Sequence, residues 1–377
     1  MRFGLDGRTI RDHFPGIGRY TYNLACAVAD AAPDDTLVVL LNEYQENSRY
    51  DLAALRARPN VEVAPVAAPP FSVREHLELP LAVRRLRLAL LHSPYYLKPY
   101  WLPVPSVTTV YDVTPARYPD YLPSRRARFI FELTTRLAIE TSAALLTLSE
   151  SAKRDMTEFF DARPDRITVT YPAVDAAYTP RPADEVAQVR ANLGLPEAYI
   201  LYLGINKPHK NLVRLVEAFA RVAAALPDVT LALAGKPDPR YPDAYDRARA
   251  LGLGDRVRVL GAIAEGSLPA LYTGAALFVF PSLYEGFGFP VLEAMACGAP
   301  VITSAVSSLP EVAGDAALLV SPTDTDALAR AMLTVLQDGR LWTRLHRASL
   351  ARAAAFSWAA AAAQTLAVYR RVGTSAP

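Results

Sequence analysis

Short runs of apolar and β-branched residues alternate with stretches in which apolar residues recur every three or four positions, almost from one end of the chain to the other. The runs are typical of buried parallel strands, and the stretches are typical of amphipathic helices. In the first half, strands are predicted at 2–5, 37–41, 61–65, 88–92, 106–111, 144–148 and 167–170, and helices at 19–31, 74–85, 124–141 and 150–160. This alternation predicts an α/β fold, in which helices flank a parallel sheet.

The alternation breaks at 171–182, a segment with three prolines in twelve residues that is typical of a connection between domains. It then resumes, with strands predicted at 199–203, 229–234, 257–260, 276–280, 300–303 and 316–320. We therefore expect two doubly wound, Rossmann-like domains, at 1–171 and 172–356, with a cleft between them.

A last helix follows Ser357, its expected N-cap, and should pack away from the second core through Trp358, Leu366 and Tyr369. Ligands of open α/β sheets bind beyond the carboxyl ends of the strands, so the loops there are the places to search for chemistry.

The composition narrows the class of protein. Hydrophobic residues make up 51% of the 377 residues and charged residues 21%, which suits packed cores and excludes a disordered chain. The net charge of +2 provides no global field that would attract nucleic acid. Cys26 and Cys297 are interpreted as buried apolar side chains, and no export segment or apolar run of about 20 residues is present, so a cytoplasmic protein is expected.

The densest group of candidate residues follows the strand predicted at 276–280, where two carboxylates bracket a glycine turn. Glu285 lies on the predicted loop and can face hydroxyl groups of a ligand, while Glu293, in the next helix, can accept two hydrogen bonds from a vicinal diol such as a ribose. The glycines would let backbone N–H groups approach an anion at the start of that helix, with Pro290 at its first position. For each glutamate alone, a surface position on an ordinary strand–loop–helix unit stays open. The candidate residues are Glu285, Gly286, Phe287, Gly288, Phe289 and Glu293.

A second group follows the strand predicted at 199–203. Lys207 and Lys210, two of only five lysines in the chain, come directly before a helical pattern, with Asn211 as its expected cap. Two ammonium groups and a helix N-terminus could hold a diphosphate together. Lysines beside a helix start are also common on protein surfaces, so that alternative stays open.

The first half offers weaker candidates. Gly16 and Gly18 lie in a predicted turn before the helix at 19–31 and could bring backbone donors to a phosphate or a sugar, although a tight turn explains them equally well. Tyr111 and Asp112 end the strand predicted at 106–111. The Asp112 carboxylate could hold a sugar hydroxyl or orient the ring of an acceptor, or it could cap a loop.

Several other chemistries find no support in the sequence. The five histidines form no i,i+4 pair and have no cysteine near them, so no metal site is expected, and there is no serine-nucleophile elbow and no Walker loop. Two clusters of arginines, on two predicted helical stretches, form either solvated helix faces or contacts to an anionic lipid surface or a phosphate-bearing acceptor. The arginines are Arg84, Arg85, Arg87, Arg125, Arg126 and Arg128.

The segments 285–293, 297–302, 271–275 and 204–211, together with 16–20, 149–153 and 356–358, occur in an order that resembles the retaining glycosyltransferases of family 4, which have the GT-B fold. The resemblance implies that Glu285 contacts the donor sugar and Glu293 the ribose of the nucleotide. It implies that Lys210, assisted by Lys207, binds the donor diphosphate.

By the same resemblance, the backbone around Val259 and Leu260 receives the base, and the last helix, 357–377, crosses back to complete the first domain. One departure is Tyr111, which stands where many relatives have a histidine that touches the donor sugar, and a phenol need not make the contact of an imidazole.

The expected function is hexosyl transfer with retention, without a metal or other cofactor. The first domain would bind the acceptor, a growing glycan or a lipid-linked sugar, and the second the nucleotide sugar, with GDP-mannose preferred and UDP-sugars close behind. Peripheral contact with the inner face of the membrane through the arginine clusters is part of this hypothesis. The alternatives are a nucleotide-sugar epimerase of the same fold and a non-catalytic two-domain sugar-binding protein.

Overall fold

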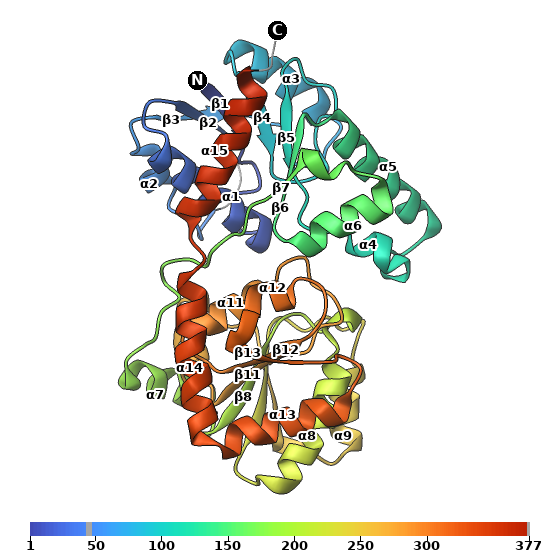
Figure 1. The fold of residues 1–377 in the computed structure, drawn as a ribbon, viewed down its shortest axis with the longest axis vertical. Helices are drawn as coiled ribbons and strands as arrows, with labels where there is room; N and C mark the ends of the chain where they lie inside the picture. Colours follow the sequence, from blue (N-terminus) through green and yellow to red (C-terminus); the bar gives the residue numbers. More distant parts are fainter. Residues whose placement is uncertain (43–46, 375–377) are drawn as a thin grey trace. The chain divides into compact units, whose positions relative to one another are not determined.

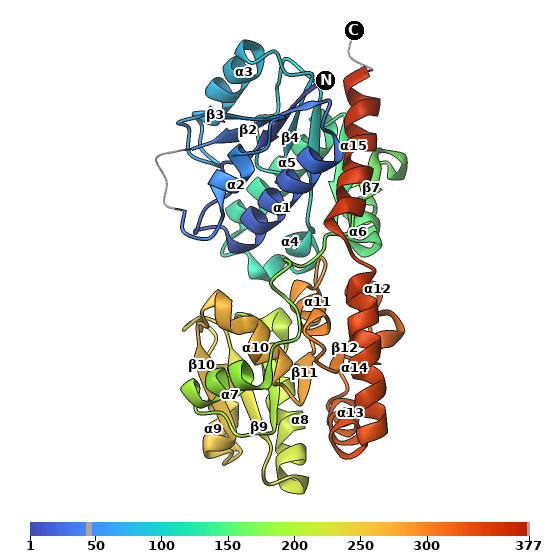
Figure 2. The same cartoon turned by 90° about the vertical axis from the view of Figure 1, so that its left-hand side faces the viewer.

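A computed structural model describes residues 1–42 and 47–374, and the chain divides into two compact units (Figure 1, Figure 2). Unit 1 comprises Met1–Pro172 and the chain from Ser357 onward, and unit 2 comprises Ala173–Phe356. Each unit is built around its own parallel sheet, so each is described by itself.

Unit 1 contains a seven-stranded sheet with the order β3-β2-β1-β4-β5-β6-β7. Its strands are β1 (Arg2–Asp6), β2 (Thr36–Leu41), β3 (Val61–Pro65), β4 (Leu90–Ser93), β5 (Ser106–Thr109), β6 (Ala144–Thr147) and β7 (Ile167–Val169). Its helices are α1 (Pro15–Ala31), α2 (Leu52–Arg56), α3 (Glu75–Arg85), α4 (Thr114–Arg117), α5 (Arg125–Thr141), α6 (Glu150–Phe160) and α15 (Trp358–Thr374), with short turns η1 (Pro119–Tyr121) and η2 (Pro164–Arg166). Because right-handed crossovers run outward from the centre of the sheet, α1 and α2 cover one face while α3, α5 and α6 cover the other.

Unit 2 contains a six-stranded sheet with the order β10-β9-β8-β11-β12-β13. Its strands are β8 (Tyr199–Leu203), β9 (Thr230–Ala234), β10 (Val257–Gly261), β11 (Leu277–Phe280), β12 (Val301–Ser304) and β13 (Ala317–Val320). Its helices are α7 (Ala183–Asn192), α8 (Leu212–Ala225), α9 (Asp243–Ala250), α10 (Leu268–Thr273), α11 (Phe289–Ala296), α12 (Leu309–Ala313), α13 (Thr325–Gln337) and α14 (Gly339–Ala354), with turns η3 (Pro208–Lys210), η4 (Gly254–Arg256), η5 (Glu265–Ser267) and η6 (Gly314–Ala316). The α/β class and the positions of the strands predicted from the sequence are confirmed.

One predicted boundary in unit 1 is wrong. Helix α1 begins at Pro15, four residues before the start expected at 19, and the Gly18 N–H already donates to the Phe14 carbonyl at 2.8 Å. A proline is favoured in the first turn of a helix because that position needs no N–H donor. Gly16 and Gly18 therefore lie inside the first turn of α1 rather than in a loop before it.

The last helix, α15, packs beside α1 in unit 1 (Figure 1). The Ser357 hydroxyl accepts a hydrogen bond from the Ala360 N–H at 3.1 Å, which confirms the predicted N-cap. The Tyr369 hydroxyl lies 2.7 Å from Nδ1 of the buried His92, whose Nε2 lies 2.8 Å from the Thr109 hydroxyl. Burial lowers the pKa of His92 to about 3, so this imidazole is a neutral link between α15 and the sheet.

Lys98 is another buried titratable group near β4 and β5. Its side chain is 1% exposed, and Nζ donates to the Ser106 hydroxyl at 2.8 Å. Burial lowers the pKa of Lys98 to about 7, because a charged amine loses its hydration in the core.

This group makes the stability of the fold depend on pH. Between about pH 7 and the ordinary lysine value of 10.5, the unfolded chain binds a proton at Lys98 that the folded chain does not. The free energy of unfolding should therefore rise with pH across this interval. Urea titrations at several pH values should show that rise in the natural protein and a flatter profile for Lys98→Met. Identical profiles for the two proteins would contradict the assignment.

Candidate functional site

The loop that follows β8 carries the two lysines and is fastened to two other loops. Asn211 donates its side-chain amide to the carbonyls of Pro281 and Pro322, at 3.0 and 2.7 Å. Asn211 has φ 61°, a left-handed conformation in place of the extended one that a capping residue adopts, so its side chain does not cap α8. Asn211 therefore occupies the expected N-cap position, but its side chain joins the loops after β8, β11 and β13 instead of capping the helix.

An ion pair lies at the centre of the candidate site in unit 2. The Lys210 ammonium is 2.6 Å from Oε1 of Glu285, and the two side chains are only 17% and 12% exposed. The same two loops are also joined by the Leu283 N–H, which donates to the His209 carbonyl at 2.7 Å. Strands β8 and β11, which precede these loops, are neighbours on either side of the point where the strand order reverses, the place where open α/β sheets bind ligands.

His209 lies between the two lysines in sequence and is itself uncharged. Burial, followed by the charges of Lys210 and Lys207, lowers the pKa of His209 to about 3. Lys207 is exposed, whereas Lys210 is partly enclosed. The loop therefore presents two ammonium groups without a third cation between them.

Two serines that the sequence did not single out support the Glu285 loop. The Glu285 N–H donates to the Ser307 hydroxyl at 3.1 Å. The buried Ser308 hydroxyl lies 2.9 Å from the Glu285 carbonyl and 2.7 Å from the Phe287 carbonyl. Isolated serines after a strand carry no signal in one sequence, so only the folded chain reveals this support.

The glycine turn leads directly into α11. Gly288 has φ 108°, and a Cβ at this position would lie 2.9 Å from Cδ2 of Leu309, so a side chain would be strained by both backbone and space. Helix α11 begins at Phe289, which places Pro290 at the second helical position rather than the expected first. The Phe287 ring is 3% exposed and packs on the Phe289 ring at 5.1 Å, so the turn can offer a ligand its backbone rather than this ring.

Glu293 is a buried carboxylate. It is 5% exposed, and its Oε2 accepts a hydrogen bond from the Tyr272 hydroxyl at 2.9 Å. Burial and the nearby Glu293 charge raise the pKa of Cys297 to about 12, so this thiol stays protonated. Because Glu285 and Glu293 are both largely enclosed, the interpretation of these glutamates as ordinary surface residues is wrong.

The two remaining predicted residues of unit 2 lie on a strand that is separated from the site just described. Val259 and Leu260 belong to β10, the edge strand two places from β8. The Val259 side chain is exposed and borders a cavity of about 430 Å³ together with Tyr245 and Gly252. The site therefore brings together Lys210, Glu285 and the start of α11. Val259 and Leu260 lie apart from this group, on the edge strand β10.

In unit 1, the predicted residues lie at the carboxyl ends of β1 and β5. Gly16 is exposed and Gly18 is buried, where a Cβ would lie 2.5 Å from the Thr9 carbonyl oxygen. The Tyr111 ring packs on Tyr20 at 5.2 Å, and burial raises the pKa of its phenol. The Asp112 carboxylate accepts a hydrogen bond from the Thr114 N–H at 2.8 Å. This is the loop-capping contact that the sequence left open as an alternative to sugar binding.

Two further features bear on cofactors and membranes. Across residues 1–42 and 47–374, no three histidine, cysteine, aspartate or glutamate side chains come together as a metal site would need. Within the same described ranges, each helix is too short or too polar to cross a bilayer.

Two family models match this chain, group 1 glycosyl transferases over residues 186–354 and glycosyltransferase family 4 over residues 15–178. The O-antigen chain mannosyltransferase B of Escherichia coli is 34% identical over 295 residues, which are 77% of this chain and 76% of that protein. The serotype-specific mannosyltransferase WbdA of E. coli is 34% identical over 234 residues, which are 61% of this chain but 29% of that longer protein. The chain therefore belongs to the group 1 glycosyl transferases of family 4 and is a glycosyltransferase.

Solved structures agree on the fold. Sucrose-phosphate synthase from Thermosynechococcus elongatus matches with a TM-score of 0.76 and 23% identity, over 100% of both chains. HepE from Anabaena, solved with UDP and glucose, matches with a TM-score of 0.72 and 19% identity, over 98% of this chain and 99% of that chain. These likenesses confirm the GT-B fold expected from the sequence.

The Tyr272–Glu293 contact should be measurable as stability. Tyr272→Phe should lower the free energy of unfolding by about 1–3 kcal/mol, because a buried carboxylate oxygen loses its O–H donor. Urea denaturation of Tyr272→Phe, Glu293→Gln and the double variant forms a thermodynamic cycle that isolates this contact. The half-buried Tyr245→Phe is the matched control, and an equal loss in that variant would show that the hydroxyl of Tyr272 has no special role.

Proposed function

We propose that this glycosyltransferase moves mannose from GDP-mannose to a growing glycan or a lipid-linked sugar, with retention of configuration and without a metal ion. The observation that carries the proposal is the partly enclosed Lys210–Glu285 pair at the reversal point of the unit 2 sheet. An ammonium held at that edge, beside the start of a helix, suits a diphosphate leaving group.

The difficult step is departure of the nucleoside diphosphate, which gains negative charge as the bond from anomeric carbon to phosphate oxygen breaks. Lys210, the exposed Lys207 and the backbone N–H groups at Gly286 and Gly288 would stabilise that charge. The acceptor hydroxyl oxygen forms the new bond on the same face of the sugar, and its proton passes to the departing phosphate oxygen. Glu285 would hold Lys210 and accept a hydroxyl of the donor sugar.

The remaining donor contacts follow the family pattern. Glu293 would bind the ribose, with its carboxylate oriented by the Tyr272 hydroxyl. The backbone at Val259 and Leu260 would receive the base. In unit 1, the N–H of the exposed Gly16 in the first turn of α1 would offer a backbone donor, whereas the N–H of the buried Gly18 is already bonded to the Phe14 carbonyl. Tyr111 and Asp112 would line the sugar, in the unit that takes the acceptor.

The donor base is the part of the proposal that is easiest to test. Two relatives named as mannosyltransferases favour GDP-mannose, whereas HepE was solved with UDP and glucose. A ligand at about 100 times its dissociation constant stabilises the native state by about 2.7 kcal/mol, so a thermal-shift panel of GDP, UDP and ADP with their sugars separates these choices. An epimerase would convert a nucleotide sugar in the absence of an acceptor, and a binding protein would leave the nucleotide sugar intact. Neither alternative is favoured, because the relatives are named as transferases.

We also propose that unit 1 contacts an anionic membrane through the six arginines on and beside α3 and α5. Seven of the nine large hydrophobic side chains exposed in the described part of unit 1 lie on or beside these two helices. They are Val73, Leu77, Leu81, Trp101, Phe129, Ile130 and Leu133, with Trp101 73% and Leu77 70% exposed.

The loop between β4 and β5 connects the two helices on this face. The Tyr96 ring of this loop lies 5.6 Å from the Phe131 ring of α5, and its Tyr100 ring lies 5.5 Å from the His76 ring of α3. Trp101 follows directly in the chain. Exposed apolar side chains next to guanidinium groups suit the interface of an anionic lipid bilayer.

The diphosphate role of Lys210 predicts a large catalytic effect. Lys210→Ala should lower kcat about 100- to 1000-fold, the usual loss when one charge-stabilising donor is removed. Arg221→Ala, which removes an exposed cation from α8, should leave kcat nearly unchanged and serves as the control. Turnover by Lys210→Ala within a few-fold of that of the natural protein would contradict the diphosphate role. Retention of configuration is tested separately, by NMR of the anomeric proton of the product.

The membrane proposal predicts binding to phosphatidylcholine vesicles that contain phosphatidylglycerol and weaker binding to vesicles that lack it. Each of Arg84→Gln, Arg85→Gln and Arg87→Gln should weaken binding to the anionic vesicles about fivefold. Leu77→Ser and Trp101→Ser should weaken it as well, while Leu251→Ser in unit 2 should not. Flotation of vesicles with bound protein measures all of these, and equal binding by every variant would contradict the surface.

A further inference from the structure

Three aromatic side chains gather at the carboxyl edge of the unit 1 sheet. Phe14 follows β1, Phe71 follows β3 and Tyr95 follows β4, and parallel strands place all three at the same edge. The Phe71 ring lies 5.4 Å from the Phe14 ring and 5.1 Å from the Tyr95 ring. We call these three residues the aromatic shelf, and Phe71 is its most exposed member, at 36%.

Phe71 adopts an unusual backbone conformation. Its φ is 64°, a left-handed value that is rare for a bulky residue and that glycine adopts without strain. A residue kept in this conformation needs support from its surroundings. The sequence thus retains a large aromatic ring at a position where the backbone alone would favour glycine.

A buried ion cluster supplies that support. The Phe71 N–H donates to Oε2 of Glu75 at 3.0 Å, and the Arg8 guanidinium donates to the same oxygen at 2.8 Å. Arg8 also binds Asp6, at the end of β1, at 2.7 Å. Arg8 and Glu75 are 3% and 2% exposed. Burying charges is costly, so a cluster whose hydrogen bonds end on the backbone of a partly exposed, strained phenylalanine points to a function for that ring.

Beside the shelf lies a guanidinium whose buried Nε has no acceptor among the described residues. The Arg11 guanidinium carbon is 4.7 Å from the centre of the Phe14 ring, and, within the described ranges, its buried Nε has no hydrogen-bond partner. Burial lowers the pKa of Arg11, because the charged form loses part of its hydration. A donor group in this state is ready for oxygen atoms from a ligand.

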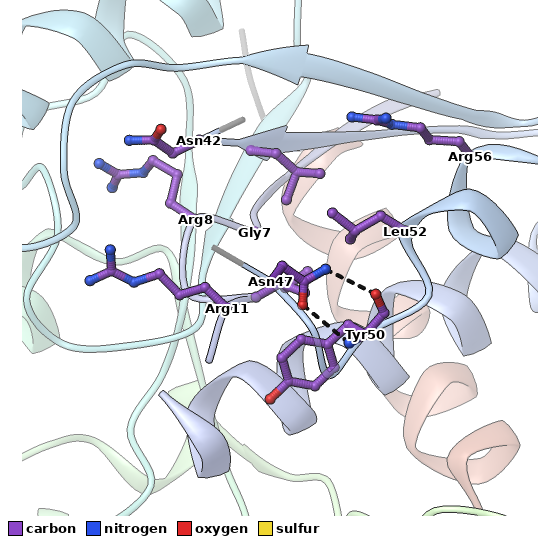
Figure 3. Close-up of a pocket in the computed structure, with 10 residues that line it drawn as sticks. Gly7, Arg8, Arg11, Asn42, Asn47, Tyr50, Leu52 and Arg56 are labelled. Carbon is purple, nitrogen blue, oxygen red and sulfur yellow. Dashed lines mark hydrogen bonds between the residues drawn. The ribbon is translucent and has the colours of Figure 1, made fainter. Parts of the chain in front are cut away.

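Arg11 also borders a cavity of about 540 Å³ (Figure 3). Figure 3 shows Arg8, Arg11 and Asn42 together on one side of it, and Asn47 and Tyr50 on the other. The Asn47 side chain exchanges two hydrogen bonds with the Tyr50 backbone, which orders that wall. Amide and guanidinium groups in a cavity suit a ligand rich in hydroxyl groups.

We propose that the aromatic shelf and this cavity bind the acceptor through its sugar, with a pyranose ring lying on Phe71 while Arg11 donates to its oxygen atoms. The face of an aromatic ring carries partial negative charge, and the C–H groups on one face of a pyranose carry partial positive charge, so the two attract each other in addition to burying apolar surface. The inference rests on the proposed glycosyl transfer and deepens it, because it makes Phe71 the positioning residue for a hexopyranose acceptor.

The test uses an α-linked mannose disaccharide as the probe and Phe71→Gly as the first variant. Glycine removes the ring but suits the left-handed backbone, so the melting temperature should stay the same or rise. The KM for the disaccharide should rise about tenfold or more, while the KM for the donor stays unchanged. Phe71→Tyr should restore the acceptor KM. Asp161→Gly is the matched control, a left-handed residue (φ 55°) at the end of α6, and it should leave the acceptor KM unchanged.

Arg11→Gln provides a second variant. It removes a partly buried charge whose Nε lacks an acceptor in the described part of the chain, so it should raise the acceptor KM without lowering the melting temperature. Saturation-transfer NMR with the disaccharide reports binding independently of turnover. The proposal is overturned if the natural protein gives no saturation transfer, if Phe71→Gly leaves the acceptor KM within twofold, or if the donor KM rises equally. If the disaccharide binds in a way that depends on Phe71 but GDP-mannose is not turned over, the result supports acceptor binding by the aromatic shelf and contradicts GDP-mannose as the donor.

Discussion

The ion pair between Lys210 and Glu285 is the interaction on which the unit 2 site depends. Neither side chain is free in water, and a partly enclosed charge is stable only where a partner compensates its lost hydration. The pair is held from the backbone as well, since Leu283 donates to His209 and Asn211 joins three loops. The ammonium therefore has a fixed position before any ligand arrives, which is the condition that the proposed stabilisation of a departing diphosphate requires.

Unit 1 uses the same physical device for a different purpose. Arg8 joins two acidic side chains in a nearly dry cluster, and the cluster ends in a hydrogen bond to the Phe71 N–H. In both units, the charges lie at the carboxyl edge of a parallel sheet, where loops from distant parts of the chain meet. Charge pairing in unit 2 fixes a cation, whereas in unit 1 it fixes an aromatic ring in a strained conformation.

The family match bears more on the proposed site in unit 2 than on the proposed site in unit 1. The proposed donor site, the lysine–glutamate pair of unit 2, lies in the segment that matches the group 1 glycosyl transferases, residues 186–354. The proposed acceptor site lies on loops of unit 1, outside that segment. The strain at Phe71 and the Arg11 guanidinium, whose Nε has no partner among the described residues, are therefore the more informative observations there, because each departs from what folding alone would favour.

The sequence by itself determined the order of the strands along the chain, the α/β class and the cap at Ser357, and it singled out Glu285, Glu293 and Lys210 as candidates, because hydrophobic periodicity and short motifs are local properties. Only the tertiary structure decided that Asn211 joins loops instead of capping α8, that α1 already includes Gly16 and Gly18, and that Glu75 reaches Arg8 and the backbone of Phe71. The contacts of Asn211 and the Arg8–Glu75 pair join residues that lie 67 to 111 positions apart in the chain, and a hydrogen bond between distant loops leaves no periodic mark in a single sequence.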